Sequence, residues 1–259
     1  MSNEKLKSPK PTTAGAASAA PANGSGFIKH PAPLYRSIDW LTFGLTTLFT
    51  FLAYYYTLAP DLTLEDSGEL AVGSFYAGVP HPPGYPVWTI YTWLFTVLVP
   101  ISNIAWRVAL ASAVAASASC GLLALMVSRG SSMMIEGIAD FKSIEKKWEN
   151  GLCVVAGFVA GCLLAFNGFY WSQAIIVEVY CFGVLSLMGV LCCLLRWVYA
   201  PHQYRYLYIA ALLFGICFTN HQTLLVAAMG IEVAVLAVDP KLGRDLFLFN
   251  SIVYCLGLY

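Results

Sequence analysis

Long apolar stretches separated by short polar loops constrain this sequence more than any other feature. Hydrophobic residues make up 59% of the chain and charged residues 11%, whereas soluble domains contain about 25% charged residues. A helix of about 20 mostly apolar residues crosses the roughly 30 Å hydrocarbon layer of a bilayer. The sequence therefore predicts an all-α integral membrane protein whose first partner is the lipid bilayer. Its net charge of zero, without a basic stripe, argues against nucleic acid as a partner.

About seven stretches are predicted to span the membrane, although the fifth is short. They cover residues 40–58, 105–127, 152–169, 179–195, 206–218, 223–238 and 246–259. The apolar stretch Val87–Val99 is too short to cross, and its Trp and Tyr residues suit a helix that lies at the membrane interface or re-enters from it. Because the last stretch is cut off, we expect the chain to be part of a longer protein with many spans.

The basic residues of the loops predict the orientation of the chain. Lys or Arg occurs in the N-terminal segment and in the loops 129–150, 196–205 and 239–245. The loops 59–86, 170–178 and 219–222 contain neither. Cytoplasmic loops are enriched in Lys and Arg, so we expect a cytoplasmic N-terminus and outward-facing acidic loops. In a bacterial cell this orientation would place the acidic loops on the periplasmic face of the cytoplasmic membrane.

The first 35 residues differ from the rest in composition. They are rich in Pro, Ala, Ser, Thr and Gly and have no apolar periodicity, so we expect a disordered tail. They also lack the apolar region of a cleaved signal peptide, which makes the first span an uncleaved anchor. The predicted organisation is a tail over 1–35 and a membrane domain over 36–259. The eight cysteines lie in or beside apolar runs and are interpreted as small buried hydrophobes.

The first outward loop carries an acidic cluster, Glu65-Asp66-Ser67-Gly68-Glu69. We expect a helix that starts with Thr63 as its N-cap and runs to about Ala77. Asp66 and Glu69 would share a face of this helix, and Glu65 would lie one turn before Glu69. Crowded carboxylates at the edge of a membrane predict a raised pKa for at least one of them, and so a proton acceptor. The alternative is a solvated loop helix without a chemical role.

A proline-rich segment follows the acidic cluster. Residues 79–86 read Val-Pro-His-Pro-Pro-Gly-Tyr-Pro, and their four prolines predict a stiff, extended backbone. This segment would hold His81 and Tyr85 beside the acidic helix as a preorganised site. A histidine there can donate to a phosphate or orient a carboxylate, and a purely structural histidine is the alternative.

Other polar residues gather at the same predicted face. Arg107, near the outward end of the second span, is suited to hold a lipid phosphate or else to snorkel to the headgroups. Glu178 begins the fourth span, while Asn220 and His221 join the fifth and sixth. Glu178 either forms a second polar wall of a site or only marks topology. Asn220 and His221 either belong to the same site or form a simple turn between two helices. Glu232 alone lies within a span and is expected to make a structural polar contact.

Several of these segments resemble one membrane-enzyme family. They are Leu64-Glu-Asp-Ser-Gly-Glu-Leu70, Gly78-Val-Pro-His-Pro-Pro-Gly-Tyr-Pro-Val-Trp88, Asn103-Ile-Ala-Trp-Arg107, Trp171-Ser-Gln with Glu178-Val-Tyr180, and Thr219-Asn-His-Gln-Thr223. Across about residues 40–259 the chain resembles the transmembrane protein O-mannosyltransferases of bacteria and animals. The resemblance implies a GT-C glycosyltransferase fold: a multi-helix membrane domain with short amphipathic helices in an outer loop that carries the active site.

The resemblance also implies an activity and roles for individual residues. Family members move a sugar, here expected to be mannose, from a polyprenyl or dolichyl phosphate to Ser or Thr of an exported protein. Asp66 matches the essential acid, Glu69 the second acid, His81 the position beside the Pro-Pro pair, and Arg107 the arginine of the next span. The supporting residues of the outer face are Glu65, Tyr85, Glu178, Asn220 and His221.

The chemistry of these residue types agrees with the resemblance. Asp66 would act as general base on an acceptor hydroxyl, and Arg107 with His81 would stabilise the departing phosphate. A single displacement would invert the anomeric carbon. No cofactor is assigned, and a divalent metal is left open because no ligand spacing supports one. The alternatives are a transporter with many spans and a glycosyltransferase of the same fold that acts on lipid or glycan.

Overall fold

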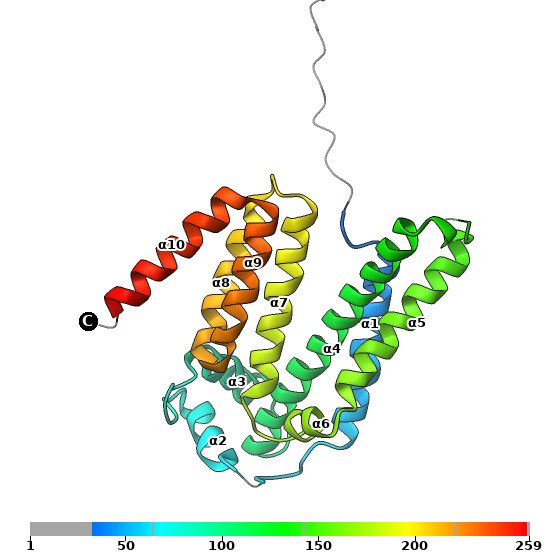
Figure 1. Ribbon diagram of the computed structural model, residues 1–259. Coiled ribbons are helices and arrows are strands. Elements are labelled where there is room, and N and C mark those ends of the chain that lie inside the picture. The colour runs from blue at the N-terminus through cyan, green and yellow to red at the C-terminus, as the bar shows by residue number, and fades with distance from the viewer. Residues whose placement is uncertain (1–32, 64, 142, 221, 258–259) are drawn as a thin grey trace, which may run out of the picture. The chain divides into compact units, whose positions relative to one another are not determined.

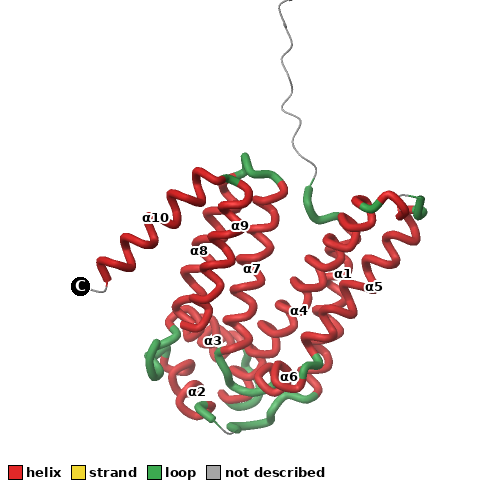
Figure 2. The backbone as a smooth tube through the Cα atoms, in the orientation of Figure 1, coloured by secondary structure: helices red, strands yellow, loops and turns green. Residues whose placement is uncertain are grey.

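A computed structural model describes residues 33–63, 65–141, 143–220 and 222–257. These residues form ten α-helices and two short 3-10 helices, and they contain no strand (Figure 1). The all-α prediction is therefore confirmed (Figure 2). The tail predicted for 1–35 lies outside the described residues apart from its last three. The compact unit begins at Pro33, and Leu34 is already buried.

The elements follow one another with short connections. In chain order they are α1 (Ser37–Tyr56), α2 (Ser67–Tyr76), α3 (Pro86–Leu98), α4 (Ile104–Gly137), η1 (Ala139–Phe141), α5 (Lys146–Ala165), α6 (Gly168–Ala174), α7 (Tyr180–Tyr199), α8 (Tyr204–Asn220), η2 (Gln222–Val226), α9 (Ala227–Val238) and α10 (Pro240–Gly257). The long helix α4 is central, because it packs against α1, α3, α5 and α7.

The side chains of α1 are distributed in the opposite way to those of a helix on a soluble protein. Its buried face is polar and follows helical spacing, whereas Leu, Phe and Trp side chains point outward. The buried residues are Asp39, Thr42, Thr46, Thr50 and Tyr54. The exposed large residues include Trp40, Leu41, Leu45, Leu48, Phe49 and Leu52. A helix with polar groups inside and apolar groups outside is suited to a lipid environment.

Three of the described helices, α4, α5 and α7, are long and apolar enough to cross a membrane, judged by length and composition. Shorter apolar helices occupy Pro86–Leu98 and Thr223–Val238. The first of these confirms the short helix expected over 87–99, while its place at the interface stays a prediction. A helix is present at each stretch predicted to span, but the number of spans also stays a prediction.

Small residues allow α1, α4 and α5 to approach closely. A Cβ added at Gly157 of α5 would lie 2.5 Å from the carbonyl oxygen of Ala124 in α4 and 2.9 Å from Cγ2 of Thr42 in α1. Gly161, one turn later, is equally confined, 2.8 Å from the carbonyl oxygen of Cys120. Such glycines let the backbones of neighbouring helices come together, as is common in membrane proteins.

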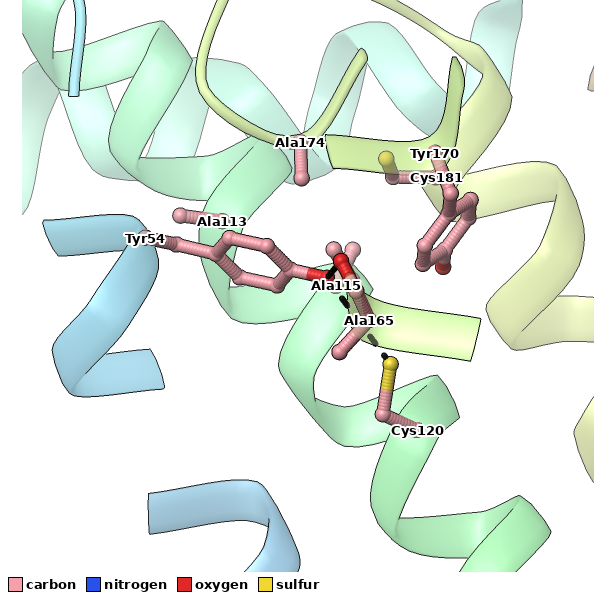
Figure 3. Close-up of a cluster of buried hydrophobic side chains, with 9 residues drawn as sticks. Tyr54, Ala113, Ala115, Cys120, Ala165, Tyr170, Ala174 and Cys181 are labelled. Atoms are coloured by element: carbon pink, nitrogen blue, oxygen red, sulfur yellow. Dashed lines mark hydrogen bonds between the residues drawn. The ribbon is translucent and has the colours of Figure 1, made fainter. Parts of the chain in front are cut away.

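Tyr54, near the C-terminal end of α1, joins the same three helices (Figure 3). Its hydroxyl donates to the carbonyl oxygen of Ala165 at 2.9 Å and lies 3.9 Å from the Cys120 sulfur. The other members of this buried cluster are Ala113, Ala115, Ala116, Tyr170, Ala174 and Cys181. The Tyr54 hydroxyl therefore has a hydrogen-bond partner inside a cluster made mostly of small side chains.

An ionic network joins the start of α1 to the start of α5. The Arg36 guanidinium pairs with Asp39 at 3.0 Å and with Glu149 at 3.0 Å. Lys146 also binds Glu149, at 2.9 Å, and Ser128 of α4 donates to Asp39 at 2.7 Å. The basic residues thus gather at the end of α1, α4 and α5 that lies away from α2, α3 and α6 (Figure 1).

Several predicted boundaries are wrong. The second span was expected to end at Val127, but α4 continues to Gly137, so Arg129 belongs to the helix and not to a loop. The predicted loop 239–245 is also helical, because α10 begins at Pro240. Asp239 explains this start: its Oδ1 accepts from the backbone N–H groups of residues 241 and 242, both at 3.1 Å.

The C-terminal helices form a second packed group. Buried residues of α7, α8 and α9 meet one another, and α10 packs against α9. The amide of Asn250 donates to the Glu232 carboxylate, so Glu232 does make the polar contact predicted from the sequence. Cys255 of α10 is exposed, which contradicts the burial expected for every cysteine, since α10 has a partner on one side only.

Candidate functional site

The linker between α6 and α7, residues 175–179, is the point at which the predicted site assembles. The Ile175 carbonyl accepts from the Ala59 N–H at 2.9 Å, which attaches the loop that follows α1. The Val177 carbonyl accepts from the Ser67 hydroxyl of α2 at 3.3 Å. The Glu178 carbonyl accepts from the Trp88 indole of α3 at 3.3 Å and from the Ser112 hydroxyl of α4 at 3.1 Å. One short segment therefore holds four parts of the chain together.

The acidic cluster folds differently from its prediction. α2 starts at Ser67 with Asp66 as N-cap, so Thr63 is not the cap; its hydroxyl lies 2.9 Å from that of Ser67 instead. Glu65 adopts a left-handed backbone, with φ of 66°. This conformation interrupts a helix, so Glu65 lies outside α2. The sequence predicts Glu65 within the helix, one turn before Glu69, and this prediction is wrong. The Leu70 N–H donates to the Asp66 carbonyl at 2.9 Å and begins the helix.

His81 joins the acidic helix to the proline-rich segment. Its backbone N–H donates to Oε1 of Glu69 at 2.7 Å, and its Nδ1 lies 3.1 Å from Oε2 of the same carboxylate. Its Nε2 lies 3.1 Å from the Tyr85 hydroxyl and 3.9 Å from Oδ2 of Asp66. Asp66 and Glu69 thus share a face of α2, as expected, and both face His81.

Close packing fixes the proline-rich segment on α2. A Cβ added at Gly73 would lie 3.0 Å from Cγ of Pro80, so a glycine lets the segment approach the helix. Tyr85 adopts φ of 43° as the N-cap of α3, and its ring is buried. An open pocket of about 410 Å³ lies beside Glu69, between α2 and residues 78–80. The site therefore has a fixed edge and an accessible side.

The electrostatics separate the carboxylates into two groups. Hydrogen bonds from His81, first from its backbone N–H, hold the pKa of the Glu69 carboxyl below its usual range. Burial, followed by the nearby Glu65 and Asp66 carboxyls, raises the pKa of Glu178 to about 7. Sequence reasoning expected the raised pKa within the cluster on α2. Glu178 lies outside that cluster and is only 4% exposed, and burial of a carboxyl group disfavours its charged form.

Arg107 lies in the first turn of α4 and binds backbone. Its guanidinium donates to the carbonyl oxygens of Thr96 at 2.9 Å, Ile101 at 3.0 Å and Ser102 at 3.0 Å. It forms no ion pair with a described carboxylate. These bonds close the C-terminal end of α3 onto α4, a role that sequence reasoning did not include.

The remaining predicted residues contribute less. Asn220 is fully buried at the end of α8, and neither its amide nitrogen nor its carbonyl oxygen has a partner among the described residues. His221 lies outside the described residues. Within the described part of the chain, no group of three or more His, Cys, Asp or Glu side chains has an arrangement that could hold a metal ion.

Ser67, Trp88 and Ser112 support the site but were missed as site residues. Each is buried and donates to a backbone carbonyl of the 175–179 linker. The available signal was weak: Ser67 stands inside the acidic motif, whereas Trp88 and Ser112 look like ordinary residues of apolar helices.

These features define the class of the protein: an all-α membrane protein in which an acid–histidine cluster lies where the short helices α2 and α3 meet the ends of long apolar helices. The family described as the Protein O-mannosyl-transferase TMEM260 N-terminal domain matches residues 66–242. The chain belongs to this family.

Two relatives show similarity over part of the chain. The mouse protein named Protein O-mannosyl-transferase TMEM260 is 30% identical over 112 residues, which cover 40% of this chain and 16% of the relative. The Dictyostelium discoideum protein of the same name is 34% identical over 68 residues, 26% of this chain and 8% of the relative. The matched regions are thus a small part of these longer proteins. No solved structure matches significantly, so the GT-C architecture stays a prediction.

Proposed function

We propose that this chain is the membrane domain of a glycosyltransferase that mannosylates Ser or Thr of exported proteins, using a polyprenyl or dolichyl phosphate as sugar carrier. One observation carries the proposal: in a chain of this family, Asp66 and Glu69 meet on His81 at an accessible edge. The names of the relatives support transfer of mannose to protein. The carrier is inferred from the membrane setting and from the family resemblance.

Asp66 is suited to be the general base. Its side chain is 61% exposed, so an acceptor hydroxyl can approach it. The carboxylate takes the hydroxyl proton as the oxygen attacks the anomeric carbon, and the carbon–oxygen bond to the carrier phosphate breaks. The bonding electrons leave with the phosphate, and the anomeric configuration inverts in this single displacement.

Glu69 orients His81 toward this base. When Nδ1 carries the proton, the ring donates to Glu69 and its Nε2 accepts from the Tyr85 hydroxyl. A second proton on Nε2 makes His81 a cation that faces Asp66 and the open side of the site. Such a cation stabilises the negative charge that develops on the leaving phosphate.

Arg107 retains some capacity for the phosphate. Three of its N–H groups are used by backbone carbonyls, and a guanidinium has five. In the proposed orientation the N-terminus is cytoplasmic and the site faces the opposite side, where exported acceptors are found. Arg107 then holds the end of α3 in place and offers its free N–H groups to the carrier.

The test uses the full-length protein in membranes, with labelled polyprenyl-phosphate mannose and a Ser/Thr-rich acceptor peptide. Asp66→Asn should lower transfer by at least about 100-fold, the usual contribution of a general base. Asp61→Asn is the matched control, because Asp61 is an exposed acid of the same loop whose carboxylate bonds the backbone of Leu62. Equal transfer by wild type and Asp66→Asn would remove Asp66 from the mechanism. Transfer to lipid in place of peptide would refute a protein acceptor.

A further inference from the structure

We propose that Glu178 is a positioning residue of the site: its carboxyl shares one proton with Glu65 and so fixes the turn that presents Asp66. The proposal concerns the structure of the site, and its consequence for sugar transfer rests on the proposed function. In the sequence, helices α2 to α6 separate Glu178 from Glu65 and Asp66.

The turn at Glu65 needs an external contact. Non-glycine residues rarely adopt a positive φ, and Glu has no special preference for this conformation. Glu65 nevertheless has φ of 66°, directly before the residue proposed as base. A backbone in this conformation persists when its surroundings hold it. A side-chain hydrogen bond joins the Glu65 carboxyl to the carboxyl of Glu178.

Glu178 is well placed to hold this turn because it is itself immobile. Its carbonyl oxygen accepts from both Trp88 and Ser112, and its own Oε2 accepts from the Val179 N–H at 3.1 Å. These bonds attach it to α3, to α4 and to the start of α7. Glu65, in contrast, is exposed and lies in an irregular segment. The buried carboxyl of Glu178, held by these bonds, therefore determines the position of the exposed carboxyl of Glu65.

The two carboxyl groups bond to each other only while a proton lies between them. The other titratable groups that face Glu178 are Asp66 of the α2 start and Tyr180 and Cys181 of α7, and Tyr85 of α3 also faces it. None of these is a cation, and among the described residues no Lys or Arg pairs with Glu178. A second negative charge at Glu178 would therefore be uncompensated, and burial together with these neighbours raises its pKa to about 7.

Loss of the shared proton would change the site. Two carboxylates in contact repel each other, so Glu65 would turn away and release its left-handed backbone. Asp66 and the first hydrogen bond of α2, from the Leu70 N–H, follow directly in the chain. The α2 start would then fray at alkaline pH, and the proposed base would lose its position beside His81.

Infrared spectroscopy of the full chain in lipid tests the shared proton without any substrate. Ordinary carboxylic acids are ionised at about pH 6, so the C=O stretch of a protonated acid at that pH should come from the Glu65–Glu178 pair. We expect this band to fade as the pH rises through about 7. Glu178→Gln should abolish it, and Glu65→Gln should move its midpoint to lower pH. Glu136→Gln, at the opposite end of α4, should leave it unchanged.

Amide hydrogen exchange tests the positioning role. After correction for intrinsic rates, residues 65–70 should exchange at least tenfold faster at about pH 8.5 than at about pH 6, and Glu178→Gln should remove this pH dependence. An absent band, or a midpoint unmoved by Glu65→Gln, would overturn the shared proton. Exchange that does not depend on pH in the wild type would overturn the positioning role. Both readouts are independent of mannose transfer, so a failure of the proposed function would leave them intact.

Discussion

The close contact between α5 and α4 makes a quantitative prediction for Gly157→Ala. The added Cβ would lie 2.5 Å from the Ala124 carbonyl oxygen and 3.1 Å from Cβ of Ser128. The first neighbour is backbone, so it cannot rotate away as the end of a flexible side chain can. Forcing one carbon into a packed interface costs about 1–3 kcal/mol. Gly157→Ala should therefore lower the free energy of unfolding by about this amount relative to a matched control.

Gly151→Ala is that control. Gly151 belongs to the same helix, and nothing lies within 4 Å of a Cβ built there. Both substitutions place Ala in the interior of α5, so the gain in helix propensity cancels between the two variants. The assay is reversible unfolding in mixed micelles followed by circular dichroism. Equal stability of the two variants would refute the argument that α5 requires a glycine at the contact with α4.

Two further predictions concern the site. Arg107→Lys should speed amide hydrogen exchange at residues 99–103, because one ammonium cannot bind the three carbonyls that the guanidinium holds. Unchanged exchange together with weakened binding of the sugar donor would instead assign Arg107 to the donor phosphate. Glu178 has an ordinary pKa of 4.5 and a folded-state pKa of about 7, so the folded protein binds the proton more tightly. Stability should fall as the pH rises from about 4.5 to about 7, a loss absent in Glu178→Gln, and thermal unfolding across this range would detect it. A parallel pH dependence in both proteins would contradict this origin.

Apolar stretches were sufficient to predict the long helices, but not their ends, and the short helix α6 lies mostly in the predicted loop 170–178. The pattern that marks a membrane span stops where polar residues begin, whereas a helix continues until a cap or a break ends it. α4 therefore continues past the polar residues that begin at Ser128 and ends at Gly137, and α10 starts at Pro240 because Asp239 caps it. Helix boundaries of this kind follow from local hydrogen bonds that hydropathy does not record.

The candidate site could be predicted in part. Asp66, Glu69 and His81 lie within one short segment, so the spacing of the motif was enough to expect their contact. The bonding of Arg107 to carbonyls and the contact of Glu178 with Glu65 could not be predicted. They depend on the path of loops and on residues that are distant in sequence, and a single sequence does not specify which distant residues meet.

The 175–179 linker has a consequence for the order in which the chain folds. Its bond to Ser67 spans 110 residues, and its bond to Trp88 spans 90. During synthesis, residues 59–86 emerge long before the segment that anchors them. α2 and the proline-rich segment must therefore wait until α4, α5 and α6 are in place and the linker has reached the same side. A fragment that stops before Ile175 would contain the whole acid–histidine motif and still lack the carbonyl groups that anchor it.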